Sequence, residues 1–169
     1  TYDDGQPQNI TEWNQMLAKI KSTANCYPFI WPSLFENYTG MVQNAVFTQL
    51  AGLEASKNYF AFDSQGKEVE MQDGSKKVIT VENGYEYFGM KEIYDTIAFM
   101  ETYFTTSNAN PAVNENTNHS DTQKRYLFAP VSGGKIAESA MICEGIWWEN
   151  EAKAGIFPQV EKQDSERGF

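Results

Sequence analysis

The order of structural elements is clearest in residues 139–152, which read SAMICEGIWWENEA. Residues 139–143 form a short apolar run, which predicts a strand. Gly145 then permits a tight turn, because glycine adopts backbone angles that are closed to other residues. Residues 147–154 predict a short helix. A strand, a turn and a helix in this order are elements from which α/β folds are built.

The same alternation of strands and helices runs along the rest of the chain. Helices are predicted at about residues 11–23, 38–56, 85–104 and 121–131, a strand at 27–30, and a polar surface loop at 105–120. The turn signal Asp73-Gly74 predicts an inserted β-hairpin at 66–84. Tyr94 and Ile97 are predicted on the buried face of the third helix. We therefore expect one α/β domain over residues 1–169, with a mixed sheet flanked by helices.

The composition narrows the class of ligand. The chain has 169 residues, of which 41% are hydrophobic and 14% aromatic, and its 13 basic and 23 acidic residues give a net charge of -10. Such a surface repels phosphate backbones and anionic membranes, so we expect no nucleic-acid partner. A neutral ligand fits this charge better, although solubility alone would account for it equally well.

Two further features of the sequence are the polar ends of the chain and its two cysteines. It starts at Thr1 without a methionine, has polar ends, and contains neither a signal peptide nor a long apolar run. We therefore expect it to be a piece of a longer protein. Cys26 and Cys143 match no metal-binding spacing. They are interpreted as buried free thiols, with a disulfide left open for an oxidising compartment.

Several kinds of chemistry find no support in the sequence. The single histidine, His119, falls in a polar loop, and neither a phosphate-binding loop nor a metal-ligand cluster is present. We therefore predict no catalytic residue, no cofactor and no metal. Acidic pairs such as Glu36 with Glu144, or Glu149 with Glu151, leave a small carbohydrate hydrolase open, because glycosidases use two carboxylates across one bond.

Two adjacent tryptophans point to a binding role. Trp147 and Trp148 fall where a strand passes into a helix, and α/β proteins bind ligands outside the carboxyl ends of their strands. An indole face there can stack on the apolar C–H surface of a sugar ring. Adjacent helical residues point in different directions, so we assign Trp147 to the ligand and Trp148 to packing. The alternative is that both are core residues.

These features resemble a known family, the bacterial extracellular solute-binding proteins of the maltose-binding type, which capture sugars for ABC importers. Four stretches match in order: Asn9–Leu17, Pro28–Tyr38, Met90–Phe104 and Lys135–Ala152. The last, with its Glu-Gly-x-Trp-Trp-x-x-Glu-Ala pattern, is the specific one. The resemblance implies a type II periplasmic-binding-protein-like lobe, the C-terminal or central part of a two-lobed parent.

The resemblance also implies a site and partners. Trp147 matches the sugar-stacking tryptophan of the lobe, Glu36 and Tyr38 match the polar and aromatic residues of the cleft loop, and Trp31 is a third aromatic candidate. The implied partners are a sugar, the missing N-terminal lobe and an ABC permease. The implied parent is a monomeric, non-catalytic bacterial lipoprotein, either anchored outside the cell membrane or periplasmic. A hydrolase and a protein-interaction domain with aromatic hot spots remain as alternative functions.

Overall fold

The computed structural model describes residues 6–104 and 107–162 and has the mixed α/β composition that the sequence predicts. The chain divides into two compact units, where we expected a single domain. Unit 1 combines Thr1–Tyr38 with Thr105–Phe169, and unit 2 is Thr39–Phe104. Unit 1 is thus assembled from segments that are distant in the sequence, whereas unit 2 is one continuous segment.

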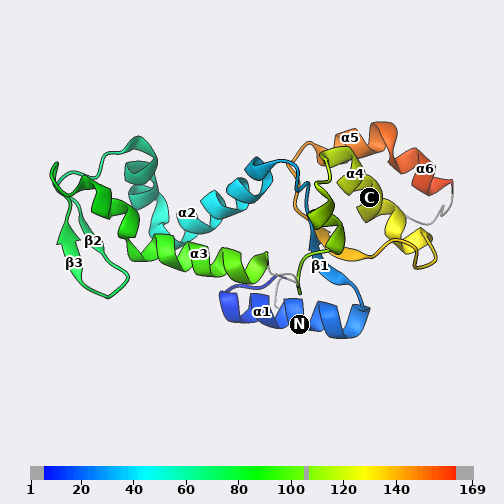
Figure 1. Ribbon diagram of the computed structural model, residues 1–169, viewed down its shortest axis with the longest axis horizontal. Coiled ribbons are helices and arrows are strands. Elements are labelled where there is room, and N and C mark those ends of the chain that lie inside the picture. The colour runs from blue at the N-terminus through cyan, green and yellow to red at the C-terminus, as the bar shows by residue number, and fades with distance from the viewer. Residues whose placement is uncertain (1–5, 105–106, 163–169) are drawn as a thin grey trace. The chain divides into compact units, whose positions relative to one another are not determined.

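The centre of unit 1 is a small parallel sheet. Strands β1 (Tyr27–Ile30) and β4 (Ser139–Ile142) lie side by side with Tyr27 opposite Ser139 and Ile30 opposite Ile142 (Figure 1). On the other side of β1, Phe29 forms a parallel bridge with Ala109. Three segments of the chain therefore run in the same direction. Both strands agree with the prediction to within one residue.

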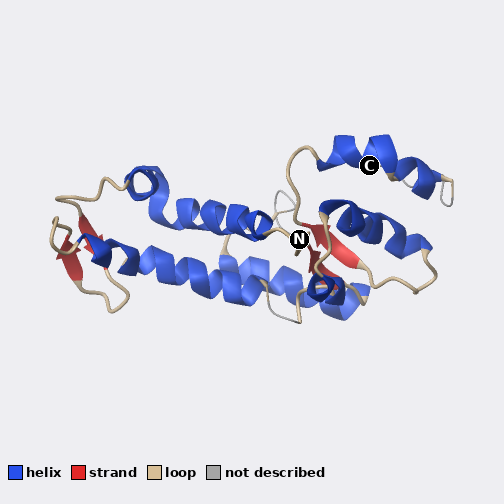
Figure 2. Cartoon of the chain, turned by 45° about the horizontal axis from the view of Figure 1, so that its top comes forward, coloured by secondary structure: helices blue, strands red, loops and turns tan. Residues whose placement is uncertain are grey.

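Helices enclose this sheet (Figure 2). They are α1 (Ile10–Lys19) with the π-helical turn η1 (Ile20–Ala24), η3 (Pro111–Glu115), α4 (His119–Phe128), η4 (Ala129–Val131), α5 (Trp148–Gly155) and α6 (Phe157–Glu161). The ring of Trp13 on α1 stacks on Phe29 of β1 at a centroid distance of 5.9 Å. Leu127, Ala152, Ile156 and Val160 form a buried cluster that joins α4, α5 and α6. The sequence did not predict α6, and His119 opens α4 instead of lying in a loop.

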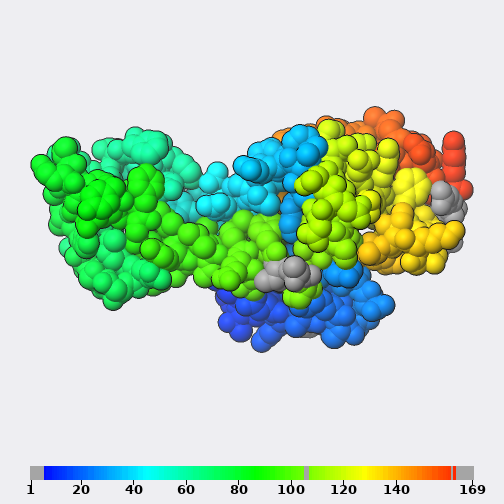
Figure 3. Space-filling view, in the orientation of Figure 1, coloured from blue at the N-terminus to red at the C-terminus, as the bar shows by residue number. Residues whose placement is uncertain are grey.

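The space-filling view shows how unit 1 is assembled from the two parts of the chain. Residues from the start of the chain, in blue, share this body with residues from about 107 onward, in yellow-green to orange (Figure 3). β1 contributes two fully buried residues, Phe29 and Ile30, with 1% and 0% of their surface exposed. The sheet is therefore buried at its central strand, while its strand ends lead into loops.

Unit 2 contains most of α2 (Glu36–Ala61), the strands β2 (Glu68–Glu70) and β3 (Lys76–Val78), the turn η2 (Gly84–Gly89) and α3 (Lys91–Tyr103). The predicted hairpin is confirmed: β2 and β3 pair antiparallel, and Gly74 takes a positive φ of 79° in the turn between them. Gly52 interrupts α2 with φ 77° and ψ 167°, angles that only glycine adopts readily. The two strand pairs form separate sheets in the described residues, so the expected single mixed sheet is not observed.

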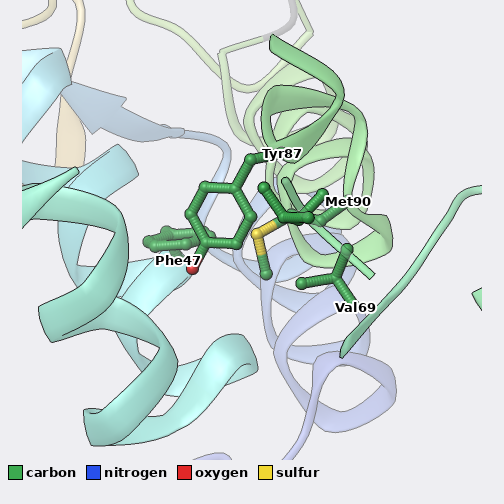
Figure 4. Close-up of a cluster of buried hydrophobic side chains, with 5 residues drawn as sticks. Phe47, Val69, Tyr87 and Met90 are labelled. Carbon is green, nitrogen blue, oxygen red and sulfur yellow. The ribbon is translucent and has the colours of Figure 1, made fainter. Parts of the chain in front are cut away.

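The core of unit 2 is a cluster of side chains from α2, β2 and η2. Phe47, Val69, Tyr87 and Met90 point toward one another in Figure 4, and Ile79 completes the cluster. The predicted buried face of α3 is only partly correct. Tyr94 and Ile97 are 41% and 53% exposed, because this short unit offers few elements to cover both faces of its helices.

None of the helices in residues 6–104 and 107–162 combines the length and the apolar character that crossing a bilayer requires.

Candidate functional site

The candidate site begins where the parallel strands of unit 1 end. Ile30 and Ile142 are the last residues of β1 and β4, and the backbone N–H of Cys143 donates to the carbonyl oxygen of Ile30 at 2.9 Å. The loops over 31–35 and 143–147 therefore leave the sheet at the same edge. The carboxyl edge of parallel strands is where α/β proteins gather ligand-binding loops.

Glu144 is the half-buried carboxylate at this edge, and three donors from different elements reach it. Gln123 on α4 donates from Nε2 to Oε1 at 3.3 Å, and the backbone N–H of Gly145 donates to Oε2 at 3.3 Å. The hydroxyl of Tyr38, from the first turns of α2, forms a further hydrogen bond with this carboxylate. The orientation of Glu144 is therefore fixed at both oxygens.

A second carboxylate joins the same network. The Nε2 atom of Gln123 also donates to Oε2 of Glu151 on α5, at 3.2 Å. Gln123 is 1% exposed, so its amide is withdrawn from water and depends on these two acceptors. We call the four residues Tyr38, Gln123, Glu144 and Glu151 the carboxylate network. It joins α2, α4, the β4–α5 loop and α5.

Burial and mutual repulsion set the protonation behaviour of this network. Burial raises the pKa of Glu144 above its ordinary value, Glu151 adds repulsion, and the donors Gln123, Gly145 and Tyr38 act in the opposite direction. Burial, followed by the neighbouring Glu144, raises the pKa of Tyr38 to about 12. The same two causes raise the pKa of the Cys143 thiol to about 11. Tyr38 is therefore a permanent hydrogen-bond donor at physiological pH.

Trp147 lies next to this network and presents an aromatic surface. Its indole is 45% exposed, and Ile146 beside it is 98% exposed. The ring rests on the backbone of Gly145, where a β-carbon would fall 2.2 Å from ring atom Cζ2. Glycine is therefore required for this position of the indole, because any other residue would displace it.

Trp148 takes the opposite role. It packs against the cluster of Leu127, Ala152, Ile156 and Val160, and its ring meets Tyr126 edge-on at 6.0 Å. The packing role that was predicted for Trp148 agrees with these contacts, whereas the ligand role of Trp147 stays a prediction. The separation follows from helical geometry, since consecutive residues at the start of α5 point in different directions.

The four predicted site residues fall in different environments. Tyr38 is 6% exposed and contacts Glu144, so the structure joins the segments that follow β1 and β4 through this pair. Glu36 is exposed at the first position of α2. Trp31 is 8% exposed, which leaves it little surface for a ligand, because the loop after β1 folds it into unit 1.

Gln123 is the residue that sequence reasoning missed. A glutamine within a polar helix carries no signal in the sequence that it will be buried, and only the packing of α4 against β4 reveals it. The sequence indicates Glu144 and Glu151 only as possible members of acidic pairs. Their common neighbour could not be identified, because the sequence does not show that α4 and α5 are adjacent.

A separate hollow of about 460 Å³ lies on unit 1 and is lined by Glu115, Asn116, Thr117, Asp121, Lys124, Arg125 and Ile136. It contains none of the predicted site residues. Arg125 within it donates to Glu115 at 2.6 Å, so this cation is already paired. Within the described part of the chain, no group of three or more His, Cys, Asp or Glu side chains is arranged to hold a metal ion. The exposed Trp147 beside the carboxylate network therefore remains the candidate site.

No protein-family model, curated protein or solved structure matches the chain.

Proposed function

We propose that the chain is the carbohydrate-binding lobe of an extracytoplasmic solute-binding protein, a non-catalytic component of a bacterial ABC sugar importer. The observation that carries the proposal is the exposed indole of Trp147, which rests on Gly145 beside the half-buried carboxylate of Glu144. An aromatic face next to fixed hydrogen-bonding groups matches the two surfaces of a sugar, its C–H face and its hydroxyl groups.

The position of these residues in the fold supports the same function. Trp147 and Glu144 come from the loop after β4, and Tyr38 comes from the helix α2 that follows the loop after β1, so the segments after both strands contribute. On this proposal the fold of unit 1 belongs to a type II periplasmic-binding-protein-like lobe. The parent protein would close a second lobe over this edge and deliver the sugar to a membrane permease, while anchored outside the cell membrane or free in the periplasm.

The complete parent provides the functional test. Its affinity for neutral oligosaccharides such as maltotriose, cellotriose and xylotriose is measured by calorimetry, in the natural form and with Trp147→Ala. We expect the substitution to weaken binding by about tenfold or more, because a stacked aromatic contributes on the order of 1–2 kcal/mol. Equal affinity in both forms would remove the role given to Trp147.

The hydrolase alternative is less well supported by the geometry. A glycosidase needs its scissile bond between two carboxylates. Here the buried amide of Gln123 fills the space between Glu144 and Glu151, donating one hydrogen bond to each. A nitrophenyl-glycoside assay tests this alternative directly. If the natural chain hydrolyses the nitrophenyl glycoside and the Glu144→Gln variant does not, the result would favour a hydrolase over a binding lobe.

One observation favours the second candidate function, a protein-interaction domain. Unit 2 exposes several large aromatic residues: Phe60 at 49%, Phe62 at 79%, Tyr85 at 74% and Phe88 at 50%. Phe62 and Phe88 lie 6.4 Å apart between ring centroids, so at least two of these rings form one patch. Exposed aromatic patches of this kind mark protein contacts. A double variant, Phe62→Ser with Phe88→Ser, that leaves sugar binding intact but abolishes a measured protein complex would assign unit 2 to this role.

A further inference from the structure

We propose that Gln123 is the positioning residue of the site: its buried side-chain amide holds the carboxylates of Glu144 and Glu151 side by side and fixes the orientation in which Glu144 meets a ligand. This inference rests on the proposed function, because it concerns how the same binding edge is kept in shape. It assigns a role to a residue of α4 that belongs to neither of the loops at the edge.

The geometry determines which way the amide points. Both contacts run from the same nitrogen atom, at 3.3 Å to Glu144 Oε1 and 3.2 Å to Glu151 Oε2. An amide nitrogen carries two hydrogens, one for each carboxylate. The reverse orientation would place the amide oxygen against two acidic oxygens with no hydrogen between them. The chemistry of the neighbours therefore selects a single orientation of the side chain.

The position of Gln123 within α4 limits its freedom further. Its neighbour Thr122 is 0% exposed and donates to Thr117 Oγ1 at 3.1 Å, and the helix begins with Asn118 accepting from the N–H of Asp121. The side-chain hydrogen bonds of Thr122 and Asn118 thus hold the start of the helix in place. If this glutamine swung into solvent, the half-buried carboxylate of Glu144 would lose its amide donor, which disfavours that movement.

The charges around the amide explain why a positioning group is needed. Neither Glu144 nor Glu151 forms an ion pair in the described part of the chain. The titratable groups that influence the pKa of Glu144 are Tyr38 from α2 and Glu151 from α5, and Glu144 in turn raises the pKa of its neighbour Cys143. Hydrogen bonds from Gln123, Gly145 and Tyr38 lower the pKa of Glu144 and so oppose the effect of burial.

This arrangement has a consequence for ligand recognition. An ionised carboxylate accepts hydrogen bonds only, whereas a protonated carboxyl also donates one. Gln123 favours the ionised form and so keeps Glu144 an acceptor for hydroxyl groups. Without the amide, the two carboxylates would repel each other and Glu144 would bind a proton at higher pH.

The test compares two substitutions of buried polar residues in the same helix. Gln123→Met removes the amide with little change in volume, whereas Thr122→Val removes a buried hydroxyl that contacts no carboxylate. The titration of the Glu144 side-chain carboxyl is followed by carbon NMR in each, with Glu144→Gln to assign the signal. We expect Gln123→Met to raise the pKa of Glu144 and Thr122→Val to leave it unchanged, although both lower the melting temperature. An unchanged pKa in a folded Gln123→Met variant would overturn the proposal.

The unmodified chain supplies a second readout that needs no stable variant. The side-chain NH₂ signals of Gln123 should shift with pH at the pKa of Glu144, because protonation of the carboxylate weakens one of their hydrogen bonds. Signals that do not respond over that titration contradict the role. Neither measurement involves a sugar, so a chain that fails to bind oligosaccharides but shows both effects would refute the proposed function and leave the positioning role standing.

Discussion

The indole of Trp147 lies directly on the backbone of Gly145, so closely that a β-carbon at Gly145 would fall 2.2–2.4 Å from three atoms of the ring. The contact links two neighbouring features of the sequence, a glycine that allows the turn after β4 and a tryptophan that remains 45% exposed. Glycine thus serves here less for an unusual backbone angle than for the room it leaves for the ring.

Gly145→Ala should therefore displace the indole of Trp147. The new methyl group cannot share the volume of the ring, so the side chain must rotate away from the loop. The nitrogen-15 NMR signal of the Trp147 indole N–H measures this change, with Trp147→Phe to assign it. Gly155→Ala is the matched control, because a β-carbon there meets no atom within 4 Å. An indole signal that stays in place in Gly145→Ala would contradict the contact.

The two adjacent tryptophans should differ sharply in their effect on stability. Trp148→Ala removes a ring that packs against Tyr126 and the cluster around Leu127, so it should lower the free energy of unfolding by about 2–4 kcal/mol. Trp147→Ala removes a largely exposed ring and should change it by less than about 1 kcal/mol. Urea unfolding followed by circular dichroism compares the two variants. Equal losses would show that both residues are core.

Glu144 should make the chain more stable at low pH than at neutral pH. Its pKa in the folded state lies above the ordinary value of 4.5, so the folded state holds this proton more tightly than the unfolded state. The resulting stabilisation is complete below the unfolded pKa and is lost as the pH rises through the folded pKa. Glu144→Gln carries no such charge. As the pH rises through this range, we therefore expect the melting temperature of the Glu144→Gln variant to rise relative to that of the natural chain. A difference that is constant with pH would refute the assignment.

Cys26 and Cys143 should remain free thiols. Cys26 precedes β1 and Cys143 follows β4. In the parallel register these positions lie at opposite ends of the strands, five residue steps or about 16 Å apart, beyond the reach of a disulfide. Ellman's reagent should find two thiols in the denatured chain without reductant. In the folded chain Cys143, with its pKa raised to about 11, should react about 100-fold more slowly than an ordinary thiol. One thiol or none in the denatured chain would show that a disulfide had formed.

The sequence predicted local structure well and tertiary relationships poorly. The strands at 27–30 and 139–142, the hairpin around Asp73-Gly74 and most helices follow from periodicity and turn residues. The division into two units did not follow from the sequence, because the chain leaves unit 1 after Tyr38, within helix α2, where no change in composition marks a boundary.

The candidate site shows the same contrast. Trp147 could be nominated from its residue type and its position just beyond a predicted strand, whereas Tyr38 and Trp31 were nominated only through the family resemblance. Trp31 is buried, because a match in sequence does not determine which way a side chain points. Gln123 could not be found at all, because its role depends on the packing of α4 beside the β4–α5 loop.

The most direct test of the account is an NMR titration of the 169-residue chain with maltotriose, cellotriose and xylotriose, observing the indole N–H of Trp147. One lobe encloses only part of a ligand, so we expect this signal to shift in a saturable way, with a dissociation constant in the millimolar range for at least one sugar. The backbone signals of the Trp148→Phe variant should shift no differently from those of the natural chain. Trp147→Ala should abolish the accompanying shifts of Glu144 and Gly145. If the Trp147 signal does not move with any of the three sugars at about 50 mM, well above a dissociation constant of about 1 mM, the carbohydrate-binding role is contradicted.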